Sequence, residues 1–132
     1  MGMFGSMDAA SSGLVVYRKW LDAVSDNIAN INDVRSTKDS AFQARYVVAQ
    51  AANYGSAGGV QVAGIALGDA KGRVVNQPDN PLADAQGNVR VPDIDLADQM
   101  TQLIIAQRGY QANLEVVERA HDAYSDALPL GG

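Results

Sequence analysis

The fold is decided by residues 100–128, which read MTQLIIAQRGYQANLEVVERAHDAYSDAL. Apolar or aromatic side chains recur there every three or four residues, which is the spacing of one face of an α-helix. The spacing predicts a helix over residues 96–128, with this row of side chains as its contact seam. The seam positions are Met100, Leu103, Gln107, Tyr110, Leu114, Val117, His121, Tyr124 and Leu128.

The N-terminal part of the chain has the same periodicity and predicts a helix over residues 7–31. Its seam positions are Met7, Ala10, Leu14, Tyr17, Leu21, Val24, Ile28 and Ile31. The residues between them are mostly polar, so each seam is narrow. Two long seams at opposite ends of a small chain most simply pack on each other as an antiparallel coiled coil.

Two glycines, Gly13 and Gly109, interrupt the predicted helices. Each costs about 1 kcal/mol relative to Ala in a helix, unless close packing requires a residue without a side chain. Gly13 is interpreted as a packing or turn glycine.

The middle of the chain predicts a small β structure. Residues 42–51 and 59–67 are rich in Val and Ala, and the second run leads into the turn sequence GDAKG at residues 68–72, followed by residues 73–75. This pattern predicts a β-hairpin. The Pro- and Gly-containing residues 77–92 are expected to form an extended return.

The expected fold class is therefore mainly α, with long N- and C-terminal helices paired as an antiparallel coiled coil and a small middle region containing a β-hairpin. We expect residues 1–33 and 95–132 to form a single helical domain into which residues 34–94 are inserted.

Composition excludes several classes of protein. The chain has 132 residues, of which 47% are hydrophobic and 19% charged, with a net charge of -5. No run approaches the roughly 18 apolar residues that a membrane span requires. Nucleic-acid binding requires clustered Lys and Arg, whereas residues 93–132 contain two basic and seven acidic residues. The first eight residues lack the basic and apolar regions of a secretory signal, so we expect no cleaved signal peptide.

The residue types leave little room for catalysis or metal binding. The chain has no Cys and one His, which excludes thiolate zinc sites, Cys nucleophiles and clusters of several His. Asp93, Asp95 and Asp98 offer carboxylates for Ca²⁺ or Mg²⁺, but acids at the start of a helix are typical caps. We expect no catalytic residue, no cofactor and no metal.

Three motifs point to a family. They are Asn27-Ile28-Ala29-Asn30 at the end of the first helix, Gly59-Val60 at the start of a strand, and Ala106-Gln107-Arg108-Gly109-Tyr110-Gln111-Ala112-Asn113 in the last helix. With them the chain resembles the flagellar rod, hook and filament axial family of bacteria over nearly its whole length. Pro78, Pro81 and Pro92, with Gly87-x-Val89, are similar to its proximal-rod branch. The chain departs from that branch at Asp79, Asn80, Asn88 and Gln99, and in having Asn32-Asp33-Val34 after the first motif.

The resemblance implies a non-enzymatic subunit that is exported uncleaved by the flagellar type III apparatus and assembles helically in the periplasm as part of the drive shaft. Its implied neighbours are copies of itself, the rod proteins FlgB, FlgF and FlgG, and the export-gate adaptor FliE. The predicted intramolecular and assembly interface comprises Met7, Leu14, Tyr17, Leu21, Val24, Ile28, Asn30, Met100, Leu103, Gln107, Arg108, Tyr110, Asn113, Leu114, Val117, His121 and Tyr124.

Alternative functions remain open from the residues. Another proximal-rod subunit of the same family would share the motifs. A secreted helical-hairpin adaptor outside the flagellum would keep the heptads without needing the run at residues 106–113. A small enzyme would have to use His121 with Asp122 or Asp126, and a single polar residue in a seam more often sets register.

Overall fold

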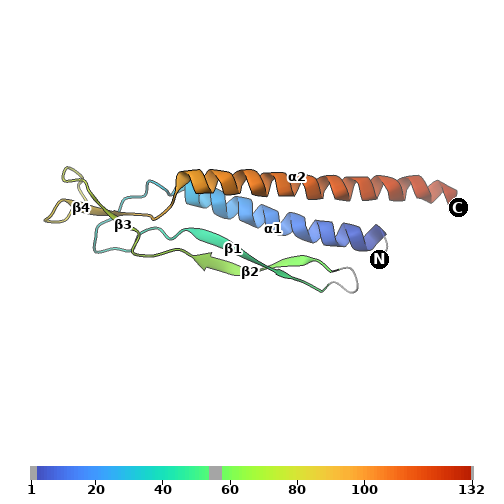
Figure 1. Cartoon of the computed structure of the whole chain (residues 1–132), viewed down its shortest axis with the longest axis horizontal. Coiled ribbons are helices and arrows are strands. Elements are labelled where there is room, and N and C mark those ends of the chain that lie inside the picture. The colour runs from blue at the N-terminus through green and yellow to red at the C-terminus, as the bar shows by residue number, and fades with distance from the viewer. Residues whose placement is uncertain (1–2, 54–57, 132) are drawn as a thin grey trace. The chain divides into compact units, whose positions relative to one another are not determined.

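The computed structural model describes residues 3–53 and 58–131. Figure 1 labels two helices and four strands, which in chain order are α1 (Met3–Ala29), β1 (Arg45–Ala51), β2 (Val60–Leu67), β3 (Arg73–Asn76), β4 (Asn88–Val91) and α2 (Leu96–Ala127). The short 3₁₀ helix η1 (Leu128–Leu130) follows α2. The strands pair as two separate two-stranded sheets, β1 with β2 and β3 with β4.

The chain divides into two compact units. The first unit comprises residues 1–21, 47–64 and 104–132, and the second comprises residues 22–46 and 65–103. Both α1 and α2 run from one unit into the other. Each unit therefore draws residues from the N-terminal, middle and C-terminal parts of the chain.

In the first unit, α1 packs against both α2 and the β1-β2 hairpin. Gly13 lies against Asn113, and Gly109 lies against the ring of Tyr17. From the first contact to the second, the residue number rises on α1 from 13 to 17 and falls on α2 from 113 to 109. The two helices are therefore antiparallel here. On the hairpin side of α1, the hydroxyl of Ser12 accepts a hydrogen bond of 3.1 Å from the backbone N–H of Val60.

In the second unit, the β3-β4 hairpin and the end of α1 enclose a small apolar core. The buried apolar residues of this unit are Ala23, Val24, Ala41, Ala44, Val89, Pro92 and Ile94. The strands pair antiparallel, with residue 73 opposite 91 and residue 76 opposite 88. A short bridge between residues 35 and 90 joins the loop after α1 to β4.

Gly72 makes the turn into β3 with a φ of 55°. This is the left-handed region that favours glycine. A side chain at this position would also overlap the carbonyl group of Val91 and the side chain of Ala41. The turn therefore depends on glycine for both its conformation and its packing.

The start of α2 is capped as expected. The helix begins at Leu96, and the preceding Asp95 accepts a hydrogen bond of 2.9 Å from the backbone N–H of Ala97. A carboxylate in this position satisfies a helix N–H that has no partner inside the helix. The caps and the periodic spacing therefore identified the position of this helix correctly. Neither described helix is both long enough and apolar enough to cross a membrane.

The predicted antiparallel coiled coil is wrong. In a coiled coil the seam residues form the core, whereas here Met100 is 52% exposed, Leu114 36% and Tyr124 37%. Residues outside the seam are buried instead, among them Val16 and Ala106. The physical reason is that α1 divides its apolar surface between α2 and the β1-β2 hairpin, so no single seven-residue stripe forms its contact face.

The predicted hairpin of residues 59–75 is also wrong. Strand β2 pairs with β1, the strand before it in the chain, and not with β3. Two hydrogen bonds continue this pairing beyond the strands. The N–H of Gly68 donates to the carbonyl of Ala44 at 2.7 Å, and the N–H of Ala41 donates to the carbonyl of Ala70 at 2.8 Å. The GDAKG turn then directs the chain into β3, whose partner is β4. Strand β4 lies within the segment expected to be an extended return.

Candidate assembly surfaces

Close helix packing in the first unit depends on two glycines. A Cβ atom at Gly109 would overlap the Tyr17 ring, and one at Gly13 would overlap the Asn113 side chain. The ring of Tyr17 also stacks on Trp20, with centroids 6.0 Å apart and planes at 18°. The glycines therefore bring the two backbones close and leave room for an aromatic side chain between them.

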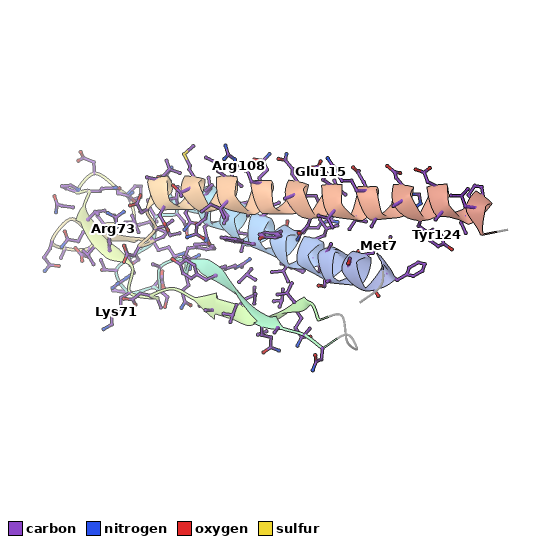
Figure 2. All side chains as sticks on the ribbon, turned by 45° about the vertical axis from the view of Figure 1, so that its right-hand side comes forward. Met7, Lys71, Arg73, Arg108, Glu115 and Tyr124 are labelled. Atoms are coloured by element: carbon purple, nitrogen blue, oxygen red, sulfur yellow. The ribbon has the colours of Figure 1, made fainter. Side chains whose placement is uncertain are left out.

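The N-terminal end of α1 contacts α2 through an aromatic pair. The rings of Phe4 and Tyr124 lie edge to face, with centroids 5.1 Å apart. In Figure 2 the Tyr124 side chain extends from the side of α2 that faces the start of α1. This pair marks the far end of the antiparallel contact, because α1 begins at Met3.

An apolar groove of about 410 Å³ lies in the first unit between α1 and the β1-β2 hairpin. Its lining is dominated by apolar and aromatic side chains, and comprises Ala9, Gly13, Val16, Tyr17, Trp20, Val47, Ala49, Val60 and Asn113. The groove is thus built on residues that also form the α1–α2 contact, so its shape follows from the packing of Tyr17 and Gly13.

In the second unit, a buried polar cluster joins α1, β1 and α2. The side-chain amide of Asn27 donates hydrogen bonds to the backbone carbonyl of Arg45 and to Oε1 of Gln99, both at 3.0 Å. Its Oδ1 accepts a bond of 2.7 Å from the backbone N–H of Arg45. Asn27 and Gln99 are both fully buried. Asn27 therefore satisfies all its hydrogen-bonding groups and fixes three elements at once.

A second polar cluster organises the loop between β3 and β4. The carboxylate of Asp84 accepts hydrogen bonds from the backbone N–H groups of Asn88 and Gln86 and from the hydroxyl of Thr37. The N–H of Asn88, and to a smaller extent the other donors, lower the pKa of the Asp84 carboxyl below its usual value, because they stabilise its charged form. Asp84 thereby ties the tip of this hairpin to the loop that follows α1.

The predicted interface residues have different degrees of burial. Val24 is buried. The half-buried members are Met7, Leu14, Tyr17, Leu21, Ile28, Asn30, Leu103, Tyr110, Asn113 and Val117. The exposed members are Met100, Gln107, Arg108, Leu114, His121 and Tyr124. Among all the predicted interface residues, Tyr17, Asn113 and Tyr124 make the inter-helix contacts described above.

Sequence reasoning did not select several residues that carry the packing. Gly109, Asn27 and Gln99 were outside the predicted interface, although Asn27 opens one of the three motifs and Gly109 lies within another. A glycine within a long helical pattern was the available signal for close packing. No periodic pattern marks Gln99, because its role depends on Asn27, which lies 72 positions away in the chain.

The outer side of α2 carries a stripe of charge. Glu115, Glu118, Asp122 and Asp126 follow one another at spacings of three or four residues, so they share one helix face, and all four are exposed. In Figure 2 Glu115 and Arg108 extend from the side of α2 that faces away from α1. The stripe is therefore separate from the α1–α2 contact.

The described residues hold no group of three or more His, Cys, Asp or Glu that could bind a metal ion. His121 lies 3.8 Å from Asp122, measured from Nδ1 to Oδ1, and both side chains are largely exposed on α2. Among the described residues, the features set out above are packing contacts and polar clusters.

Comparisons with known proteins give a matching family model and several similar proteins. Residues 85–130 match the family model described as "Flagellar basal body rod FlgEFG protein C-terminal". The chain is 35% identical to the flagellar basal-body rod protein FlgC of Salmonella typhimurium and 39% identical to that of Yersinia enterocolitica, covering 99% of both chains in each case. It is 28% identical to FlgC of Bacillus subtilis, again over 99% of both chains.

Proposed function

The chain belongs to the FlgC family of flagellar basal-body rod proteins, and we propose that it builds the rod by packing the outer surfaces of α1 and α2 against neighbouring subunits. It is a structural subunit of the flagellar basal-body rod. The observation that carries this conclusion is the identity of 35–39% that extends over 99% of both chains.

The proposed mechanism is transmission of torque through a stiff helical assembly. Support comes from the lengths of the helices, since α1 has 27 residues and α2 has 32. These correspond to roughly 40 and 48 Å at 1.5 Å per residue. Within the first unit the glycine-dependent contact holds α1 against α2, and within the second unit the buried Asn27 cluster does so.

The subunit assembles with other components of the flagellar rod. We propose that its specific neighbours are copies of itself, the FlgB, FlgF and FlgG rod proteins and the adaptor FliE. This finer proposal rests on the family resemblance of the motifs at residues 27–30 and 106–113. It is supported by the number of apolar side chains left exposed on α2, among them Met100, Ile104 and Ile105.

The subunit is located in the flagellar basal body. We propose that it reaches the periplasmic part of the rod through the flagellar type III export apparatus without cleavage. This route rests on the resemblance of the motifs at residues 27–30 and 106–113 to the axial family. Recovery of the chain from purified basal bodies with its N-terminal residues removed would argue against it.

We further propose that the subunit has no enzymatic activity and no cofactor. The relatives are named as rod proteins, and the single His of the chain lies exposed near the end of α2. A His121→Gln variant is expected to swim normally, whereas a motility loss in a folded, assembled variant would contradict this proposal.

The test of the proposed function is electron cryo-microscopy of basal bodies isolated from the bacterium that carries this chain. We expect side-chain density for Trp20 and Tyr110 in the rod, and we expect deletion of the gene to remove both the rod and swimming. Complete rods in the deletion strain would show that another protein fills this role.

A further inference from the structure

The acidic stripe on α2 is only partly neutralised within the chain. Glu115 pairs with Arg119 at 2.6 Å, and Asp122 lies near His121. Glu118 and Asp126 form no ion pair with any residue of the described ranges 3–53 and 58–131. The stripe therefore offers unneutralised carboxylates to a partner.

A basic patch lies on α1 in the same unit. Arg18 and Lys19 are adjacent and exposed. Neither forms an ion pair with a residue that the structure describes. Val15, one turn earlier, is 60% exposed, so the patch combines positive charge with an apolar side chain. These are the properties that complement the acidic stripe.

Within one molecule the two surfaces cannot meet. Tyr17 lies against Gly109, which places Arg18 and Lys19 about level with residue 108 of α2. From there to Asp122 is a rise of roughly 21 Å along the helix. This exceeds the screening length of about 8 Å at physiological salt, so the two surfaces hardly interact within the chain.

We propose that a second copy of this chain occupies the acidic stripe, with Arg18, Lys19 and Val15 of its α1 lying against Glu118, Asp122 and Asp126 of the first copy. The two copies would be displaced along the helix axis by roughly 21 Å, which brings the complementary surfaces level. The contact joins two different surfaces, so it repeats from copy to copy and generates a ring or a helix. The inference rests on the proposed function, because it names the partner of this rod subunit.

A second copy is favoured over another protein by charge. Each copy carries both halves of the contact, a basic and apolar half on α1 and an acidic half on α2. Single exposed ion pairs contribute little. Several pairs along one stripe, with Val15 among them, provide the complementarity that sets orientation and register.

Disulfide cross-linking in assembled basal bodies tests the contact, since the chain has no natural Cys. The double variant Lys19→Cys, Asp122→Cys is expected to give cross-linked dimers and longer products under oxidation. A disulfide between these positions of one molecule is excluded, because it requires Cα atoms within about 7 Å. Dimers from Lys19→Cys alone would mean that α1 contacts α1, and would overturn the proposal, as would the absence of products from the double variant.

Charge reversal supplies a second test. Arg18→Glu with Lys19→Glu is expected to abolish the cross-link between Cys residues placed at Val15 and Asp126, and to reduce swimming. Adding Glu118→Lys with Asp122→Lys should restore both. The matched control is Lys38→Glu with Lys71→Glu, which changes the net charge equally at exposed positions of the second unit and should preserve the cross-link.

The outcomes separate this inference from the proposed function. If the reversed chain swims and builds complete rods that contain it, the copy-to-copy contact is refuted and the rod function stands. If the wild-type chain is missing from purified rods, the rod function itself fails.

Discussion

The side-chain amide of Asn27 near the end of α1 donates a hydrogen bond to Oε1 of Gln99 near the start of α2, at 3.0 Å, and both side chains are fully buried. Asn27 also bonds both backbone groups of Arg45 at the start of β1. Burying polar groups is unfavourable unless each finds a partner. Every hydrogen-bonding group of Asn27 has a partner, whereas the buried Nε2 of Gln99 has none among the residues that the structure describes. Asn27 is therefore the residue that holds the three elements in this arrangement.

Replacing Asn27 with Ala is expected to destabilise the protein by about 3 kcal/mol, because it removes both hydrogen bonds to the Arg45 backbone and leaves the buried Oε1 of Gln99 without its partner. Urea unfolding followed by circular dichroism measures this change. Asn32→Ala, at an exposed position shortly after the helix, is the control and should change stability little. Equal losses in the two variants would show that the cluster contributes no special stability.

Gly109→Ala is expected to lower stability even though Ala is the better helix former. The new Cβ would overlap the Tyr17 ring, and overpacking of this kind costs about 1–3 kcal/mol, against a propensity gain of about 1 kcal/mol. Gly64→Ala is the control, since a Cβ there meets nothing within 4 Å. In the Tyr17→Ala background the penalty of Gly109→Ala should disappear, and an unchanged penalty would rule out this contact as its cause.

Ala106→Leu should destabilise the first unit by about 1–3 kcal/mol, because Ala106 is fully buried in the closely packed helix face and a larger side chain has no space. Ala112→Leu, at an exposed position of the same helix, is the matched control. Thermal unfolding of the purified chains distinguishes them. A lower midpoint for Ala112→Leu than for Ala106→Leu would contradict the assignment of the contact face.

Asp84→Asn is expected to remove a stabilisation that depends on pH. The pKa of the Asp84 carboxyl is lower in the folded chain than its ordinary value of 3.8. At pH values near and below this ordinary value, the folded state therefore binds fewer protons than the unfolded state, so the free energy of unfolding rises with pH. The difference between wild type and Asp84→Asn should be fully present above about pH 5 and fade as pH falls through the lowered pKa.

Urea unfolding at a series of pH values from neutral to acidic measures this dependence. Asp79→Asn, an exposed carboxylate on the same loop, is the control. If the Asp84→Asn difference stayed constant down to the most acidic pH, the hydrogen bonds to the carboxylate would have no role in stability.

The helices were predictable because their signals are local. Periodicity predicted residues 7–31 and 96–128, and the structure has Met3–Ala29 and Leu96–Ala127. Asp95 identifies the start of α2 because a cap interacts with N–H groups only two or three residues away. The motif at residues 106–113 likewise pointed to the family to which the chain belongs.

The pairing of strands was not predictable in this way. The GDAKG sequence does form a turn, with Gly72 in the left-handed region, but a turn sequence does not specify the partner of the strand before it. That choice depends on residues 41–44, which lie far from residues 68–70 in the chain and continue the ladder of β1 and β2. Such long-range pairing leaves no spacing that can be read locally.

By itself, the sequence determined the two long helices and the membership of the rod family, because these depend on residue types and short-range spacing. The residue types also led to the expectation that the chain has no catalytic residue. Only the tertiary structure decided which faces of those helices are used. The apolar surface of α1 is divided between α2 and a β hairpin, Gly109 accommodates Tyr17, and Asn27 meets Gln99. These contacts depend on burial and close packing between distant residues, which a periodic pattern does not specify.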